Sequence, residues 1–127
     1  MTIFRSSLVA ATLLLASSNP ALAHTQLVAA TPAQGSTVSA PRTLSLTFSE
    51  PMLIQTVAFS VVMTAMPGMA DHGEMVIRNF TPAWSDENRK LTLNLKKPLQ
   101  AGTYDLRWQA AGADGHRMSG KVTFNVK

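Results

Sequence analysis

Apolar and polar side chains alternate along much of the chain, and this alternation predicts β-strands. Every second residue is apolar in the segments 44–48, 91–95, 104–108 and 122–126, with polar residues between them. Because neighbouring side chains of a strand point to opposite faces, each segment would bury one face and expose the other. Apolar stretches at 26–30, 57–64 and 75–80 predict further strands.

Turn-forming residues separate these segments, and no convincing amphipathic helix is found. The predicted turns lie at Pro32, Gly35, Pro41, Pro51, Pro82, Pro98 and Gly102. About seven short antiparallel strands indicate one all-β domain, a Greek-key β-barrel or β-sandwich of the cupredoxin or immunoglobulin type. Gly102 before Tyr104 predicts a tyrosine tucked under a strand corner, and Trp108 is expected to anchor the core.

Residues 1–23 have the pattern of a secretory signal peptide. A single positive charge at Arg5 precedes an apolar run over 8–16, and Ala21-Leu22-Ala23 forms a small-residue cleavage site. The apolar run is shorter than the roughly 20 residues that a transmembrane helix needs. We therefore expect an exported, soluble domain of residues 24–127, with His24 as its first residue.

Composition excludes several classes of function. The chain has no cysteine and a formal net charge of +4 at pH 7. Without thiolates, a soft metal ion would have to be bound by methionine and histidine. The lysines and arginines are scattered without a basic stripe, so a nucleic-acid partner is not expected. Motifs of serine hydrolases, zinc proteases and phosphate-binding loops are also absent from the sequence.

The first set of candidate metal ligands consists of His24, Asp114 and His116. A histidine at a free N-terminus offers an amine and an imidazole nitrogen from one residue. Asp114 and His116 are two positions apart, so in an extended segment their side chains project the same way. Three nitrogens and one oxygen suit Cu(II), although the set could also hold zinc, and Asp-Gly-His is compatible with an ordinary turn.

The second set lies in a methionine-rich segment. Four of the seven methionines fall between positions 63 and 75. Their spacing could form one face of a helix, but Pro67-Gly68 would break that helix. An exposed loop is therefore expected, in which thioether sulfurs and one imidazole favour Cu(I). The candidate ligands of this set are Met63, Met66, Met69, His72 and Met75.

Several motifs occur together over nearly all of residues 24–127. They are the histidine at 24 with Thr31-Pro32, Phe48-Ser49-Glu50, the methionine-rich segment, Gly102 to Tyr104 with Trp108, and Asp114-Gly115-His116 before Ser119-Gly120. This combination resembles the CopC/PcoC family of periplasmic copper-binding proteins. The resemblance implies a small cupredoxin-like β-barrel with a Cu(II) site and a Cu(I) site at opposite ends, formed by the two ligand sets above.

The resemblance also implies a role. It indicates a periplasmic copper carrier or chaperone in copper homeostasis or resistance, which is not an enzyme and is monomeric. Its partners would be copper ions and an inner-membrane copper transporter of the CopD type or a periplasmic multicopper oxidase. Glu50 is a further candidate ligand for Cu(II). Two residues separate Met69 from His72 where one is expected, which leaves open which methionines accompany His72.

Two other functions are compatible with parts of the sequence. An N-terminal histidine with a second histidine also resembles the copper brace of lytic polysaccharide monooxygenases, which are copper-dependent oxidative enzymes. Against this, the domain is small for a substrate face, and Asp114 would block an open coordination position. A β-sandwich adhesion module without metal would require both ligand sets to be coincidental.

Overall fold

The computed structural model describes residues 25–69 and 73–127. The predicted signal peptide, residues 1–23, and the candidate ligands His24 and His72 lie outside the described residues. The described strands are β1 (Leu27–Thr31), β2 (Thr37–Val38), β3 (Thr43–Phe48), β4 (Ala58–Ala65), β5 (Met75–Ile77), β6 (Phe80–Ser85), β7 (Lys90–Leu95), β8 (Gly102–Ala111) and β9 (Arg117–Val126). A short 3-10 helix, η2 (Ile54–Thr56), precedes β4. In these ranges no helix is long and apolar enough to cross a bilayer.

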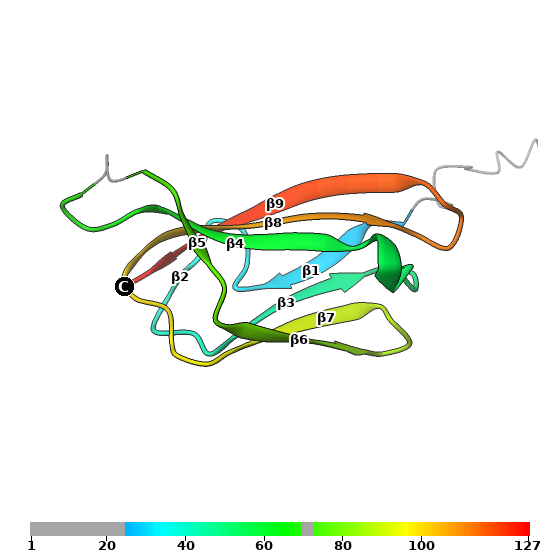
Figure 1. The fold of residues 1–127 in the computed structure, drawn as a ribbon, viewed down its shortest axis with the longest axis horizontal. Helices are drawn as coiled ribbons and strands as arrows, with labels where there is room; N and C mark the ends of the chain where they lie inside the picture. Colours follow the sequence, from blue (N-terminus) through cyan, green and yellow to red (C-terminus); the bar gives the residue numbers. More distant parts are fainter. Residues whose placement is uncertain (1–24, 70–72) are drawn as a thin grey trace, which may run out of the picture.

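The strands form two sheets that lie face to face (Figure 1). One sheet has the order β1-β3-β7-β6, and the other has the order β2-β9-β8-β4-β5. The long β8–β9 and β4–β8 pairs are antiparallel, whereas the short β2 runs parallel to β9. Both sheets are open at their edges, so the all-β prediction is confirmed in its sandwich form and the closed barrel is wrong.

The predicted alternation places one side of the strands in a core between the two sheets. The buried residues include Leu44, Leu46 and Phe48 of β3, Leu91 and Leu93 of β7, Tyr104, Leu106 and Trp108 of β8, and Val122, Phe124 and Val126 of β9. Phe48 and Trp108 meet edge to face with ring centres 5.2 Å apart. Such aromatic pairs contribute about 0.5–1.5 kcal/mol beyond their burial.

Two predictions about single aromatic residues are confirmed. The Tyr104 hydroxyl donates a hydrogen bond of 2.7 Å to the carbonyl oxygen of Gln100, which forms the expected corner. Burial raises the pKa of Tyr104. Trp108 is only 8% exposed, and its ring lies against Gly120 of β9. A Cβ added at Gly120 would be 2.9 Å from that ring, so the tryptophan occupies space that only glycine leaves open.

Two details differ from the prediction. Segment 75–80 is not one strand, because β5 pairs with β4 in one sheet whereas β6 begins at Phe80 and pairs with β7 in the other. Pro82 lies within β6 and not in a turn. Since β6 is an edge strand, it tolerates a residue without a backbone N–H.

The described members of the two predicted ligand sets lie at opposite ends of the sandwich. The turn between β8 and β9 lies at one end, drawn in orange in Figure 1, together with η2. The chain that leaves β4 towards Met69 lies at the other end, drawn in green. Any metal bound at one end is therefore separated from the other end by the length of the strands.

Candidate metal centre

The turn between β8 and β9 brings Asp114 and His116 together. One oxygen of the Asp114 carboxylate, Oδ2, lies 2.9 Å from Nδ1 of His116. The other, Oδ1, accepts a hydrogen bond of 3.0 Å from the backbone N–H of His116. The His116 side chain is 74% exposed. The two side chains therefore meet as expected, although a turn and not an extended segment creates the contact.

Thr25 lies next to this pair. It is only 7% exposed, and it lines a pocket of about 170 Å³ with Asp114, His116, Arg117 and Met118. A Cβ at Gly112 would overlap the Thr25 hydroxyl, so the missing side chain of Gly112 allows this close approach. The residue that follows His24 in the sequence is thus packed against the Asp114–His116 turn.

Glu50, the further candidate, contacts Thr25. Its Oε2 accepts a hydrogen bond of 3.5 Å from the Thr25 hydroxyl. Among residues 25–69 and 73–127, no three or more histidine, aspartate or glutamate side chains form a group that could hold a metal ion. Asp114 and His116 could therefore provide two donors, and a complete metal site would need further donors.

Three methionines of the second set line one pocket at the opposite end. Met63, Met66 and Met75 share a pocket of about 250 Å³, whose walls also include Leu99 and Tyr104. Met63 of β4 is paired directly with Met75 of β5. Directly paired residues of antiparallel strands project to the same face, so these two thioethers lie on one side of the sheet.

The expectation of an exposed methionine loop is wrong for Met63. Met63 is 3% exposed and belongs to the hydrophobic core, because its position in β4 points inward. Met66 is half-buried against that core, whereas Met69 is 56% and Met75 49% exposed. The backbone N–H of Met69 donates to the carbonyl oxygen of Met66 at 3.1 Å, which closes a turn over Pro67-Gly68. The segment therefore leads from the core to the surface.

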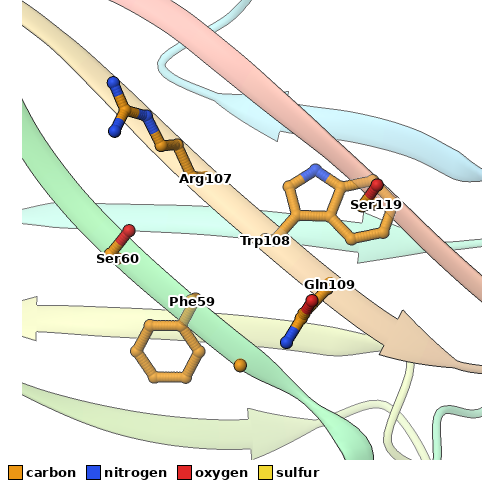
Figure 2. A pocket seen from close by; sticks show the side chains of 7 residues that line it. Phe59, Ser60, Arg107, Trp108, Gln109 and Ser119 are labelled. Atoms are coloured by element: carbon orange, nitrogen blue, oxygen red, sulfur yellow. The ribbon is translucent and has the colours of Figure 1, made fainter.

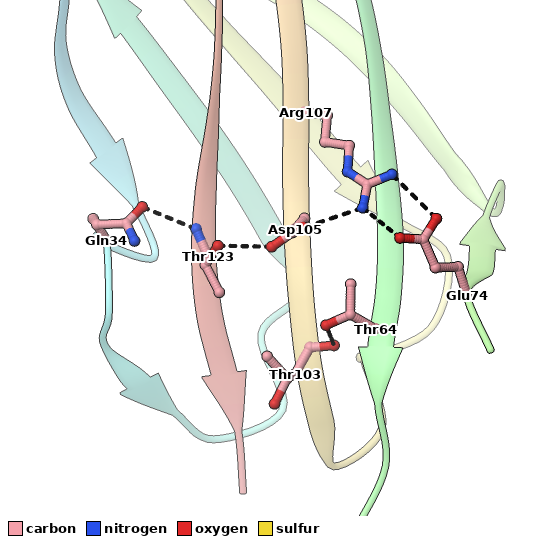
Figure 3. Close-up of polar contacts among 7 residues, drawn as sticks. All are labelled: Gln34, Thr64, Glu74, Thr103, Asp105, Arg107 and Thr123. Carbon is pink, nitrogen blue, oxygen red and sulfur yellow. Dashed lines mark hydrogen bonds and ion pairs between the residues drawn. The ribbon is translucent and has the colours of Figure 1, made fainter. Parts of the chain in front are cut away.

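A polar network that the sequence did not predict lies on the outer face of the five-stranded sheet. Arg107 of β8 binds Glu74 through both ends of its guanidinium and also contacts Asp105 (Figure 3). Hydrogen bonds and charge from Arg107 lower the pKa of Glu74. The two-residue spacing of Asp105 and Arg107 places them on one face of a predicted strand, but nothing in the sequence points to Glu74 as their partner.

The same face carries a shallow depression of about 320 Å³ over β4, β8 and β9. Figure 2 shows Ser60, Arg107, Gln109 and Ser119 around it. Its lining contains no histidine, methionine or carboxylate, so it offers a copper ion none of the donors discussed above. The pocket lined by methionines and the pocket beside Asp114 and His116 are the better candidates for binding a metal ion.

The comparison with known families agrees with the geometry. The model of the CopC domain matches residues 27–127. This chain belongs to the CopC family. The resemblance indicated by the sequence motifs is thereby confirmed, and it extends to both ends of the sandwich, from β1 to the end of β9.

Individual CopC proteins are similar over most of their length. Copper resistance protein C of Pseudomonas syringae pv. tomato is 41% identical over 107 residues, which cover 84% of this chain and 83% of that protein. Copper resistance protein C of Xanthomonas campestris pv. juglandis is 38% identical over 120 residues, or 94% of this chain and 91% of that protein. The crystal structure of PcoC, a methionine-rich copper resistance protein from Escherichia coli, superimposes with a TM-score of 0.72 at 31% identity, covering 83% of this chain and all of that one.

Proposed function

We propose that the protein is a periplasmic copper carrier that serves copper resistance or homeostasis and is not an enzyme. The names of its CopC relatives support copper as the cargo. The observation that carries the proposal is the contact between Asp114 and His116, with Thr25 packed beside it. In this arrangement, Thr25, the residue that follows His24, lies beside His116, which is the only histidine among the described residues.

The Cu(II) site consists of His24, Asp114 and His116. Asp114 Oδ2 and His116 Nδ1 are 2.9 Å apart. Two donors bound cis to one ion in a tetragonal site, each at about 2.0 Å, lie about 2.8 Å apart. The observed separation is close to that value, but the two atoms face each other in a hydrogen bond, so copper would replace the shared proton and both side chains would turn towards the ion. The amine and imidazole of His24 supply the other two donors, and Glu50 remains a further candidate.

This site depends on cleavage after Ala23. Before cleavage, the backbone nitrogen of His24 is an amide, which does not offer the lone pair of a free amine. The Cu(II) site thus forms only in the exported domain of residues 24–127. A carrier that acquires its strongest chelate after export would not take copper from the cytoplasm.

The Cu(I) site lies in the methionine-rich segment. Met63, Met66 and Met75 line one pocket, and Met69 is exposed at the turn beside Met66. Thioether sulfur is a soft donor that favours Cu(I) over Cu(II) and zinc. We include Met69 and His72 in the proposed ligand set, with Met75 at the solvent side of the pocket.

One site has nitrogen and oxygen donors and the other has soft sulfur donors, so the position of copper depends on its oxidation state. The Cu(II) ligands lie at the end of the sandwich with the β8–β9 turn, and the thioethers lie at the other end. An exposed thioether exchanges readily, which suits transfer of Cu(I) to an inner-membrane copper transporter of the CopD type or to a periplasmic multicopper oxidase. The protein would act as a monomer in such a transfer.

The proposal is tested by titrating Cu(II) into two forms of the domain, one that begins at His24 and one with a single extra N-terminal residue. The form beginning at His24 should bind one Cu(II), and the extended form should bind at least about tenfold more weakly. Both forms should bind Cu(I) equally. Equal Cu(II) affinity of the two forms would show that the N-terminal amine is not a ligand.

A further inference from the structure

Strand β5, which carries Met75, has few backbone contacts to hold it. It is three residues long and lies at the edge of the five-stranded sheet, where it pairs only with β4. Met75 is 49% and Val76 50% exposed. Short edge strands of this kind open locally at low free-energy cost. Pairing with β4 alone therefore restrains the Met75 thioether weakly, and a further contact is needed to fix its position.

An ion pair supplies a side-chain connection to this strand. Glu74 directly precedes β5, whereas Arg107 lies on β8, so the contact passes over the intervening strand β4 (Figure 3). Arg107 Nη2 is 2.7 Å from Glu74 Oε1, and Nη1 is 3.2 Å from Oε2. Arg107 is paired with Ser60 of β4, and Asp105 is paired with Val62 of the same strand. A two-point contact of this type fixes orientation as well as distance.

The guanidinium is itself anchored in the sheet. Arg107 Nη2 lies 3.3 Å from Oδ2 of Asp105, which is only 5% exposed. The other oxygen of Asp105 accepts a hydrogen bond of 2.7 Å from the Thr123 hydroxyl of β9. Gln34 Oε1 in turn accepts from the backbone N–H of Thr123 at 3.0 Å. A buried carboxylate requires such partners. Asp105 is itself fixed by Thr123, so it restrains the Arg107 guanidinium more than solvent would restrain an exposed arginine.

We propose that Arg107 and Glu74 are positioning residues for Cu(I) binding. Their ion pair holds β5 in register with β4, so that Met75 stays opposite Met63 in the methionine pocket. Neither residue binds copper in this arrangement. The inference rests on the Cu(I) site proposed above. It explains why an ion pair spans β4 on the outer face of the sheet, opposite the thioethers on the inner face.

The first test measures Cu(I) affinity by competition with a chromophoric Cu(I) chelator. Arg107→Gln and Glu74→Gln should each weaken Cu(I) binding about three- to tenfold. This loss lies between the effect of breaking an exposed ion pair and the effect of removing a residue that orients a metal ligand. The double variant should be no weaker than either single variant, since both remove the same contact. Cu(II) affinity should not change.

A matched control is the exposed ion pair between Arg89 and Glu87, which are 3.0 Å apart in the turn between β6 and β7. Arg89→Gln removes one cationic side chain as Arg107→Gln does, but it leaves β5 untouched. It should not change Cu(I) affinity. A loss equal to that of Arg107→Gln would mean that net charge and not position is responsible, which would overturn the inference.

A second readout does not involve copper. Hydrogen exchange of the backbone amides of residues 75–77 should be about three- to tenfold faster in metal-free Arg107→Gln and Glu74→Gln than in the parent protein, and unchanged in Arg89→Gln. Glu74→Gln leaves the Arg107–Asp105 contact in place. It therefore keeps the inference testable if removal of Arg107 unfolds the domain by leaving Asp105 without its cation.

The possible outcomes separate the inference from the proposed Cu(I) site. If Met75→Leu leaves Cu(I) binding unchanged, the proposed site is wrong and the inference with it. If Met75→Leu weakens Cu(I) binding but Glu74→Gln and Arg107→Gln do not, only the positioning role is wrong. If Glu74→Gln weakens binding whereas Arg107→Gln strengthens it, Glu74 binds copper itself, which also overturns the inference.

Discussion

Met63 and Met75 are directly paired across the β4–β5 ladder, yet one is buried in the core and the other is half exposed. Their shared pocket therefore has a fixed inner wall and an accessible outer one. Met63 is held by the packing of the sandwich, whereas Met75 depends on a short edge strand. Of these two thioethers, Met75 is therefore the one that an ion from solvent can reach.

Substitution of the accessible thioethers should separate the two oxidation states. Met66→Leu and Met75→Leu each remove one soft donor but keep side-chain volume nearly constant. We expect each to weaken Cu(I) binding by at least about tenfold, on the scale of other ligand-shell changes, with Cu(II) binding unchanged. Competition titrations with a Cu(I) and a Cu(II) chelator measure the two affinities in parallel.

Met118→Leu is the matched control for these variants. Met118 is half-buried against the core and lines the pocket that contains Asp114 and His116, at the opposite end of the sandwich. It should leave Cu(I) affinity unchanged. If all three leucine variants weakened Cu(I) binding alike, copper would not be bound by the methionines of one pocket.

The burial of Met63 shows where sequence patterns reach their limit. Methionines three positions apart and an interrupting Pro67-Gly68 indicate a loop, but the same pattern is compatible with a strand that ends just before the turn. Only the pairing register with β8 decides that Met63 points inward. The boundary between β5 and β6 was missed for a similar reason, since alternation does not reveal which of two sheets a short strand joins.

Tyr104→Phe should destabilise the domain in a way that depends on pH. Loss of the hydrogen bond to Gln100 should lower the free energy of unfolding by about 1 kcal/mol at neutral pH, measured by urea denaturation. Burial raises the pKa of folded Tyr104 above its ordinary value of 10.0. In the parent protein, the hydroxyl therefore ionises more readily when unfolded, and stability falls as pH rises above about 10.

The difference between the two proteins isolates this effect, since they differ only in the Tyr104 hydroxyl. The stability of Tyr104→Phe should fall less steeply above about pH 10 than that of the parent protein. The chain has a single tyrosine, so its ultraviolet absorbance reports ionisation of this hydroxyl alone. Parallel stability curves over the whole alkaline range would contradict a raised pKa.

Asp114→Asn tests the charge of the proposed Cu(II) site without changing the size of the side chain. The amide keeps the size of the carboxylate and an oxygen that can accept from the His116 backbone, but it is a poorer ligand for a divalent ion. We expect Cu(II) affinity to fall by at least about tenfold while Cu(I) affinity stays the same. Asp86→Asn, an exposed acid in the turn between β6 and β7, is the control and should change neither affinity. An equal loss in both variants would point to long-range charge and not to ligation.

The Asp–His pair could be expected from the sequence because the two residues are neighbours in a short turn. Contacts between distant segments could not. Thr25 reaches the β8–β9 turn only because β1 and β8 belong to facing sheets, and because Gly112 leaves space for its hydroxyl. The connection from Gln34 through Thr123 and Asp105 to Arg107 likewise depends on the order of strands, which local alternation does not encode.

Gly112→Ala should weaken Cu(II) binding without removing any donor. The added Cβ overlaps the Thr25 hydroxyl and comes within 3.2 Å of the Thr25 Cβ, so the hydroxyl must turn away and the residue must shift. Displacement of Thr25 shifts the chain next to His24, and we expect an affinity loss of about tenfold, since ligand sites tolerate little misplacement. Ala113→Ser, at the exposed neighbouring position, is the control and should bind normally. Cu(I) affinity measures whether the rest of the sandwich is intact. If Gly112→Ala bound Cu(II) as tightly as the parent protein, the position of Thr25 would not set the geometry of the site.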